Sequence, residues 1–145
     1  MAAYNEKNRQ ERLRLIALLE SLSDAQLEEK LPNGWRVADA LAHLAFWDCY
    51  DVALLQEWQR NGFHKPSAEW NPINAAVESM SRTIPFPALR AWVRDSAEQS
   101  DHCVEQIAPV LADAIVAVGK EDFLFRSTHR AHHLNQIENL SGPKC

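Results

Sequence analysis

The chain has 145 residues, a net charge of −5 and no block rich in lysine or arginine. This length is most simply one domain spanning residues 1–145, and the acidic balance argues against nucleic acid as a partner. No apolar run approaches the roughly 20 residues that a membrane span needs, so we expect no membrane partner either.

The N-terminal residues lack the apolar core of a secretory signal. The three cysteines, Cys49, Cys103 and Cys145, lie far apart and form no Cys-x-x-Cys pair. An odd number of scattered cysteines is typical of reduced thiols in an intracellular protein. We therefore expect a cytoplasmic protein without disulfides.

Hydrophobic periodicity predicts four long helices, over residues 5–22, 36–60, 87–107 and 127–140. Shorter helices are predicted over residues 25–30 and 73–83, and the apolar residues 110–118 fit either a short helix or a packed loop. No segment alternates with the period of two that a strand requires. The expected fold class is all-α, a four-helix bundle with one or two short extra helices.

The last predicted helix carries three histidines within five positions. Ser127 and Thr128 at its start give an N-cap signal. Helical geometry places His129 and His133 one turn apart on the inward face, whereas His132 points toward solvent. Two imidazoles at this spacing can bind one metal ion. Arg130 also points inward, so it needs a carboxylate partner or a path to water.

His43 lies at the margin of the apolar face of the helix predicted over 36–60, one turn before Trp47. A lone inward histidine is usually a packed core residue, but the histidine pair elsewhere weakens that interpretation. Asp51 lies in the middle of the same face, about 12 Å from His43 along the helix, which is too far to share one ion. We consider Asp51 a candidate partner for Arg130 or for a polar group of a substrate.

Three ordered motifs resemble those of the DinB-like superfamily. Residues 34–48 (GWRVADALAHLAFWD) are similar to its entry into the second helix, and residues 129–137 (HRAHHLNQI) are similar to its H-x-x-x-H-x-x-Q-I motif. Between them, residues 70–77 (WNPINAAV) resemble a W-x-x-x-N segment. The superfamily includes the DinB group, bacillithiol-transferase-like proteins, the ClbS/DfsB group and the bundle domain of mycothiol-dependent maleylpyruvate isomerase.

The resemblance implies that His43, His129 and His133 are metal ligands. Arg36 stands where these proteins usually have a Ser or Thr helix cap. The chain ends at residue 145, so we do not expect the activity of the two-domain isomerase. Family habit also implies a homodimer.

Three histidine ligands leave an open coordination position on a divalent metal ion. We expect zinc or nickel, although iron and manganese also fit three histidines. Such a position takes water or a low-molecular-weight thiol, and the resemblance favours the thiol. Gln136, one turn past His133, either orients a bound group or caps a neighbour. Trp35, Trp47 and Trp70 are candidates for a substrate pocket, although two of the three are expected to be core or interface residues. No residue is assigned as catalytic.

Three interpretations follow. The first is a metal-dependent thiol transferase or hydrolase that acts on a small electrophile in detoxification or stress response. The second is a non-catalytic bundle that sequesters a small molecule or toxin, as in the ClbS/DfsB group. The third is a structural bundle whose histidines simply face inward. An open coordination site with a pocket would favour the first, and a pocket without metal would favour the second.

Overall fold

A computed structural model describes residues 2–141 and places them in seven α-helices and one 3₁₀ helix; Cys145 lies outside this range. The elements are α1 (Ala3–Ser21), α2 (Asp24–Leu27), α3 (Val37–Asn61), α4 (Trp70–Ser81), α5 (Phe86–Glu105), α6 (Pro109–Ala117), η1 (Glu121–Phe123) and α7 (Arg126–Ser141). Within the described range there is no strand. The expected fold class is confirmed, and residues 109–117 form a helix rather than a loop.

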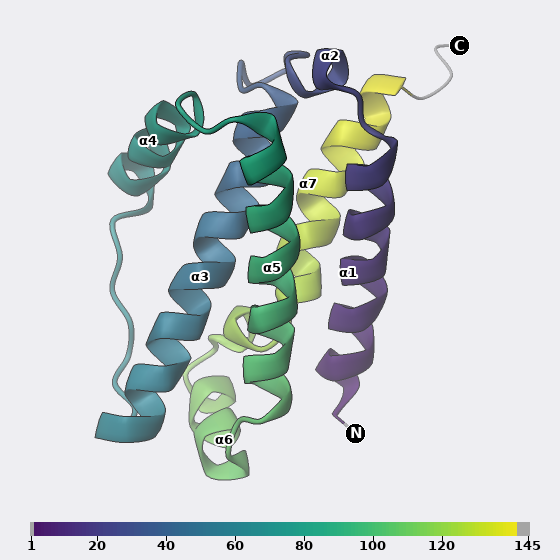
Figure 1. The fold of residues 1–145 in the computed structure, drawn as a ribbon. Helices are drawn as coiled ribbons and strands as arrows, with labels where there is room; N and C mark the ends of the chain where they lie inside the picture. Colours follow the sequence, from purple (N-terminus) through teal and green to yellow (C-terminus); the bar gives the residue numbers. More distant parts are fainter. Residues whose placement is uncertain (1, 142–145) are drawn as a thin grey trace.

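The four long helices form a closed ring in which α3 packs on α5, α5 on α1, α1 on α7 and α7 on α3. Figure 1 shows α1 and α7 running in one direction and α3 and α5 in the other. Two neighbouring helices that run the same way need a long connection, and residues 62–69 followed by α4 provide it. Among the described helices, none is long and apolar enough to cross a membrane.

The short helix α4 is held on α3 by two side-chain hydrogen bonds. The indole Nε1 of Trp47 donates to Oδ1 of Asn74 at 2.8 Å, and the Ser81 hydroxyl donates to the Asp39 carboxylate. Asp39 also accepts from the backbone N–H of Arg36, the residue before α3. An acidic side chain therefore caps α3 although Arg36 replaces the usual Ser or Thr.

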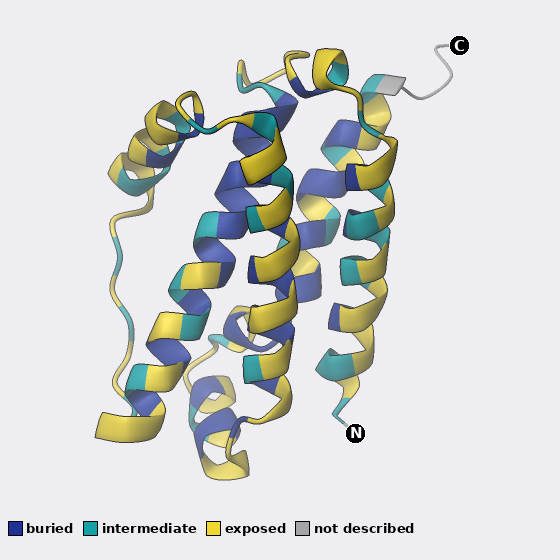
Figure 2. Cartoon of the chain, in the orientation of Figure 1, coloured by how far each residue is buried: buried dark blue, intermediate teal, exposed yellow. Residues whose placement is uncertain are grey.

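The core consists of two apolar clusters separated by a layer of charged residues. The first cluster fills one half of the bundle between α1, α3, α5 and α7, and the second packs the far ends of α3 and α5 against α6. Figure 2 shows the buried residues continuing along the inner faces of the helices. The charged layer lies between the clusters and comprises the buried residues Asp48, Asp51, Asp101, Arg126 and Arg130 together with the partly buried Arg12, which pairs with Asp101.

The start of α7 differs from the prediction. The helix begins at Arg126, so Ser127 lies inside the first turn and does not cap it. Its backbone N–H donates to Oδ1 of Asn8 at 2.8 Å, and Nδ2 of Asn8 donates to the Leu124 carbonyl at 2.7 Å. Asn8 is buried on α1, so a side chain from another helix satisfies this helix terminus.

Candidate metal site and adjoining cavity

Three histidine side chains from two helices meet inside the bundle. His43 projects from α3, and His129 and His133 project from successive turns of α7. The ring centroids lie 4.7 Å apart for His43 and His133, and 4.9 Å apart for each of the other two pairs. One nitrogen from each ring can be chosen so that all three lie within 4.8 Å of one another. The structure thus brings together the three histidines that the sequence identified, and metal binding by them stays a prediction.

Burial keeps the three imidazoles uncharged. Loss of hydration lowers the pKa of His43 to about 4, of His133 to about 4 and of His129 to about 2. The positive charge of Arg126 lowers the pKa of His129 further. At neutral pH each ring therefore carries a free lone pair, which is the form that binds metal ions.

Hydrogen bonds orient the rings. Nδ1 of His133 lies 2.9 Å from the side-chain oxygen of Gln136, which can only accept. With the amide in this orientation Nδ1 donates the hydrogen bond, and the Nε2 lone pair is then available to a metal ion. Trp35 packs beside both His43 and His133, with centroid distances of 5.1 and 6.4 Å. His132 is exposed, as predicted, and does not belong to the three-histidine group.

The donor set fits a divalent cation. Nε2 of His43 lies 2.9 Å from Nε2 of His129. Two nitrogens that share a tetrahedral zinc ion lie about 3.3 Å apart, so the rings of His43 and His129 need to separate by only a few tenths of an ångström. The Nδ1 atom of His43 is buried and has no hydrogen-bond partner among residues 2–141. Three neutral imidazoles suit zinc, nickel or iron better than magnesium or calcium, which prefer oxygen ligands.

A cavity of about 510 Å³ opens beside the histidines and is lined by both His43 and His129. Its volume is in the range of pockets that hold small molecules. Four aromatic residues form much of its wall, and Trp47 packs against Trp70 at 4.7 Å and against Tyr50 at 5.1 Å between centroids. The fourth is Phe123. Of the three tryptophans considered from the sequence, Trp47 and Trp70 line the cavity, whereas Trp35 packs on the histidines.

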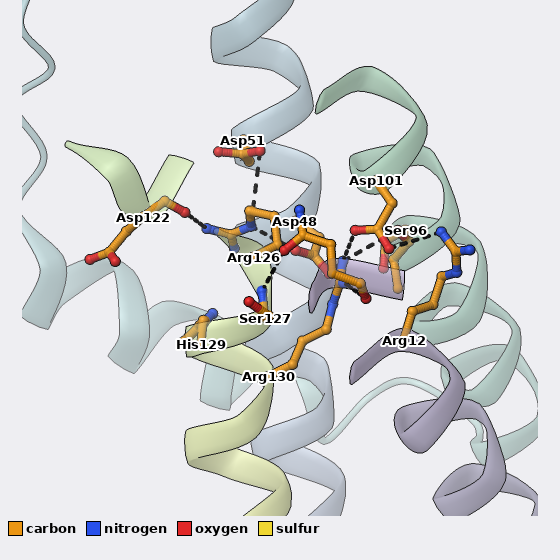
Figure 3. Close-up of polar contacts among 12 residues, drawn as sticks. Arg12, Asp48, Asp51, Ser96, Asp101, Asp122, Arg126, Ser127, His129 and Arg130 are labelled. Carbon is orange, nitrogen blue, oxygen red and sulfur yellow. Dashed lines mark hydrogen bonds and ion pairs between the residues drawn. The ribbon is translucent and has the colours of Figure 1, made fainter. Parts of the chain in front are cut away.

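Arg130 is completely buried, and its partners differ from those expected. Its Nη2 atom lies 2.8 Å from an Asp101 oxygen and 3.4 Å from an Asp48 oxygen, and it also donates to the Ala97 carbonyl at 3.3 Å. The prediction that Arg130 needs a carboxylate partner is confirmed, but the prediction that Asp51 is this partner is wrong. Asp51 instead lies 3.9 Å from Nε of Arg126 (Figure 3).

Sequence reasoning missed four functional candidates, which are Asp48, Asp101 and Arg126 in the charged layer and Lys120 in the cavity lining. Arg126 and Lys120 line the cavity, whereas Asp51, Arg130 and Gln136 do not. A signal for the burial of Asp101 was present, because it follows Ala97 at i+4 and precedes Val104 at i+3 on the apolar stripe of α5. Arg126 had no such signal, since the predicted helix began after it.

Comparison with protein-family models matches residues 8–128 to the mycothiol maleylpyruvate isomerase N-terminal domain. The match covers most of the chain. The chain belongs to this family. It is a DinB-like family, which confirms the resemblance identified from the motifs. Searches of curated proteins and of solved structures found no significant match.

Within this mycothiol maleylpyruvate isomerase N-terminal domain, the matched segment contains His43 but ends one residue before His129. The family match therefore covers α3 with His43 and stops before the α7 pair, and metal binding by the three histidines stays a prediction. The sequence motifs and the three-dimensional cluster independently identify the same three residues, His43, His129 and His133.

Proposed function

We propose that His43, His129 and His133 bind one divalent metal ion and that the protein transfers a low-molecular-weight thiol to a small electrophile held in the adjoining cavity. The observation that carries the proposal is the group of three neutral imidazoles, two of which line a cavity of small-molecule size. A structural zinc site usually has four protein ligands, whereas three with an adjacent cavity suit a site that admits water or substrate.

A bound metal ion would supply the positive charge that lets a thiol lose its proton near neutral pH. The protein's own residues hold and shield the site. Gln136 orients the His133 ring, Trp35 packs beside two of the rings, and the aromatic wall offers apolar contacts to the electrophile. Thiol use is supported by the name of the family, whose isomerase depends on mycothiol. Hydrolysis by a water at the same position is the second reaction that this arrangement supports.

Metal analysis of untagged protein tests the proposal. We expect about one equivalent of zinc or nickel in the wild type and in His132→Ala, and loss of metal in His43→Ala and His133→Ala. His132→Ala is the matched control, because it removes an exposed imidazole next to a proposed ligand. A wild type that contains no metal, and that binds added zinc or nickel only weakly, would contradict the proposal.

The metal-loaded protein can then be assayed with a thiol and a chromogenic aryl chloride. The sulfur–carbon bond forms, the carbon–chlorine bond breaks, and chloride and one proton are released. Turnover that requires both thiol and His133 would support the transferase. The alternative function is non-catalytic sequestration of a small molecule, which the aromatic cavity also favours. Tight ligand binding by a metal-free wild type without turnover would support that alternative.

A further inference from the structure

The cavity has a second polar end, formed by Arg126 and Lys120. Arg126 precedes His129 by three residues and His133 by seven on α7, so it lies about 5 to 10 Å from the histidines along the helix axis. This end of the cavity is not needed for metal binding. Metal binding by the histidines therefore does not account for Arg126 and Lys120 in the cavity lining.

Arg126 is over nine-tenths buried and retains an unused donor. Its Nε donates to an Asp48 oxygen at 3.0 Å, and its Nη1 donates to the Asp122 carbonyl at 3.1 Å. Its Nη2 is buried and has no hydrogen-bond partner within residues 2–141. A guanidinium binds planar acidic groups through adjacent N–H donors, so the unused nitrogen is suited to an anion.

The carboxylates around Arg126 do not fully neutralise the charged layer. Both Asp51 oxygens are buried, neither has a hydrogen-bond partner within residues 2–141, and burial raises the pKa of Asp51 to about 8. Asp51 is therefore mostly protonated at pH 7. Three arginines, Arg12, Arg126 and Arg130, then face the two remaining carboxyl groups, Asp48 and Asp101. The layer carries an excess positive charge, and Arg126 is its member at the cavity wall.

Lys120 adds a second positive charge at the same end. Its side chain is half-buried in the cavity lining and forms no ion pair with any described residue. The opposing charge at this wall is the exposed Asp122, whose carboxylate points away from the Arg126 guanidinium in Figure 3. Arg126 and Lys120 are the arginine and lysine side chains of this cavity lining, so the attraction for an anion is assigned to them.

We propose that Arg126 and Lys120 form an anion subsite that binds the acidic group of an otherwise apolar ligand. The ligand body lies between Trp47, Trp70 and Phe123, and its acidic group is a carboxylate or sulfonate. If the proposed function holds, the reacting carbon of the ligand lies at the histidines, one to two helical turns of α7 from the acidic group. The ligand is then a monoanionic aryl or alkenyl electrophile.

Two probes that differ only in their charge test the subsite. 8-Anilinonaphthalene-1-sulfonate is an apolar arylamine with one sulfonate, and N-phenyl-1-naphthylamine is the same arylamine without it. Their dissociation constants are measured by fluorescence on EDTA-treated native protein, so that the result does not depend on metal. The variants are Lys120→Gln, Arg126→Lys, the distant control Lys30→Gln, and Thr128→Trp. Thr128 lines the cavity, so the last substitution places a large side chain in it.

We expect Lys120→Gln and Arg126→Lys each to raise the dissociation constant of the sulfonate about tenfold and to change that of the neutral probe less than twofold. Lys30→Gln should change neither, and Thr128→Trp should weaken both. 1-Naphthoate should displace the sulfonate from the wild type if the subsite also takes carboxylates. Lys120→Gln keeps the proposal falsifiable even if Arg126→Lys fails to fold.

Sulfonate binding that is unaffected by Lys120→Gln, that weakens equally with the neutral probe, or that survives Thr128→Trp would overturn the subsite. The proposed function fails on a different result, the absence of metal from the wild type. Charge discrimination in a protein that binds no metal would support the subsite and contradict the enzyme proposal.

Discussion

Asp51 provides the sharpest test of the buried charged layer. An unfolded Asp has a pKa of about 3.9, whereas the buried carboxyl has a pKa of about 8 because it has lost its hydration. Above pH 3.9 the unfolded chain has released this proton, but the folded chain retains it up to about pH 8. Folding therefore takes up a proton across this window, and the resulting loss of stability reaches about 4 kcal/mol at pH 7.

The substitution Asp51→Asn removes this cost while keeping the size of the side chain. The new amide group would lie next to the Arg126 guanidinium, which offsets part of the gain. We therefore expect the free energy of unfolding to rise by about 2 kcal/mol at pH 7, about half of the roughly 4 kcal/mol loss in the wild type. The gain should grow as the pH rises from 5 to 8, because only the wild type must bind a proton. Urea unfolding of EDTA-treated protein at pH 5, 6, 7 and 8 measures both the gain and its slope.

The matched control is Asp48→Asn, one turn earlier on the same face of α3. Asp48 bonds directly to Arg126 at 3.0 Å and to Arg130 at 3.4 Å. Removing its charge leaves two buried guanidinium groups short of a partner, which costs about 3 kcal/mol or more. Equal destabilisation by Asp51→Asn and Asp48→Asn would show that both carboxylates are ionised, and the excess positive charge inferred for the layer would then be wrong.

Two further predictions concern Asn8 and the histidines. Asn8→Ala removes the two hydrogen bonds that the Asn8 side chain makes with Leu124 and Ser127, so it should lower the free energy of unfolding by about 2 kcal/mol, whereas Gln10→Ala on the exposed face of α1 should change it little. In metal-free protein, acidification below pH 6.5 protonates the histidines of the unfolded chain but not His129, whose pKa is about 2. Between pH 7 and pH 5, the free energy of unfolding of His129→Asn should therefore fall by about 2 kcal/mol less than that of the wild type. Urea unfolding at the two pH values measures this, and an equal fall in both proteins would contradict it.

The sequence predicted the helices and the histidine cluster for a physical reason. Helical periodicity is local, so the positions of His129 and His133 on one face follow from their spacing. The third histidine of the cluster, His43, needed the motif resemblance, because nothing local shows which face of α3 meets α7. The structure confirms the convergence of these three rings without testing the ion itself.

The partners of the buried charges could not be predicted in the same way. Asp51 was correctly placed on the inner face of α3, but its pairing depends on the axial register between α3 and α7. That register brings Asp48 rather than Asp51 to Arg130. Asn8 carried a readable signal, since it lies seven and eleven residues before the buried Leu15 and Leu19 and continues their stripe.

The position of the charged layer links the stability of the bundle to its cavity. Replacing a buried ion network with apolar residues often stabilises a protein, so the layer is not explained by stability alone. Arg126 is the member that contacts both the layer and the cavity. If Asp51 were ionised, the layer would be neutral and Arg126 would attract an anion weakly. The raised pKa of Asp51 and the anion subsite are therefore two consequences of one arrangement, and Asp51→Asn should preserve sulfonate binding at pH 7 while extending it above pH 8.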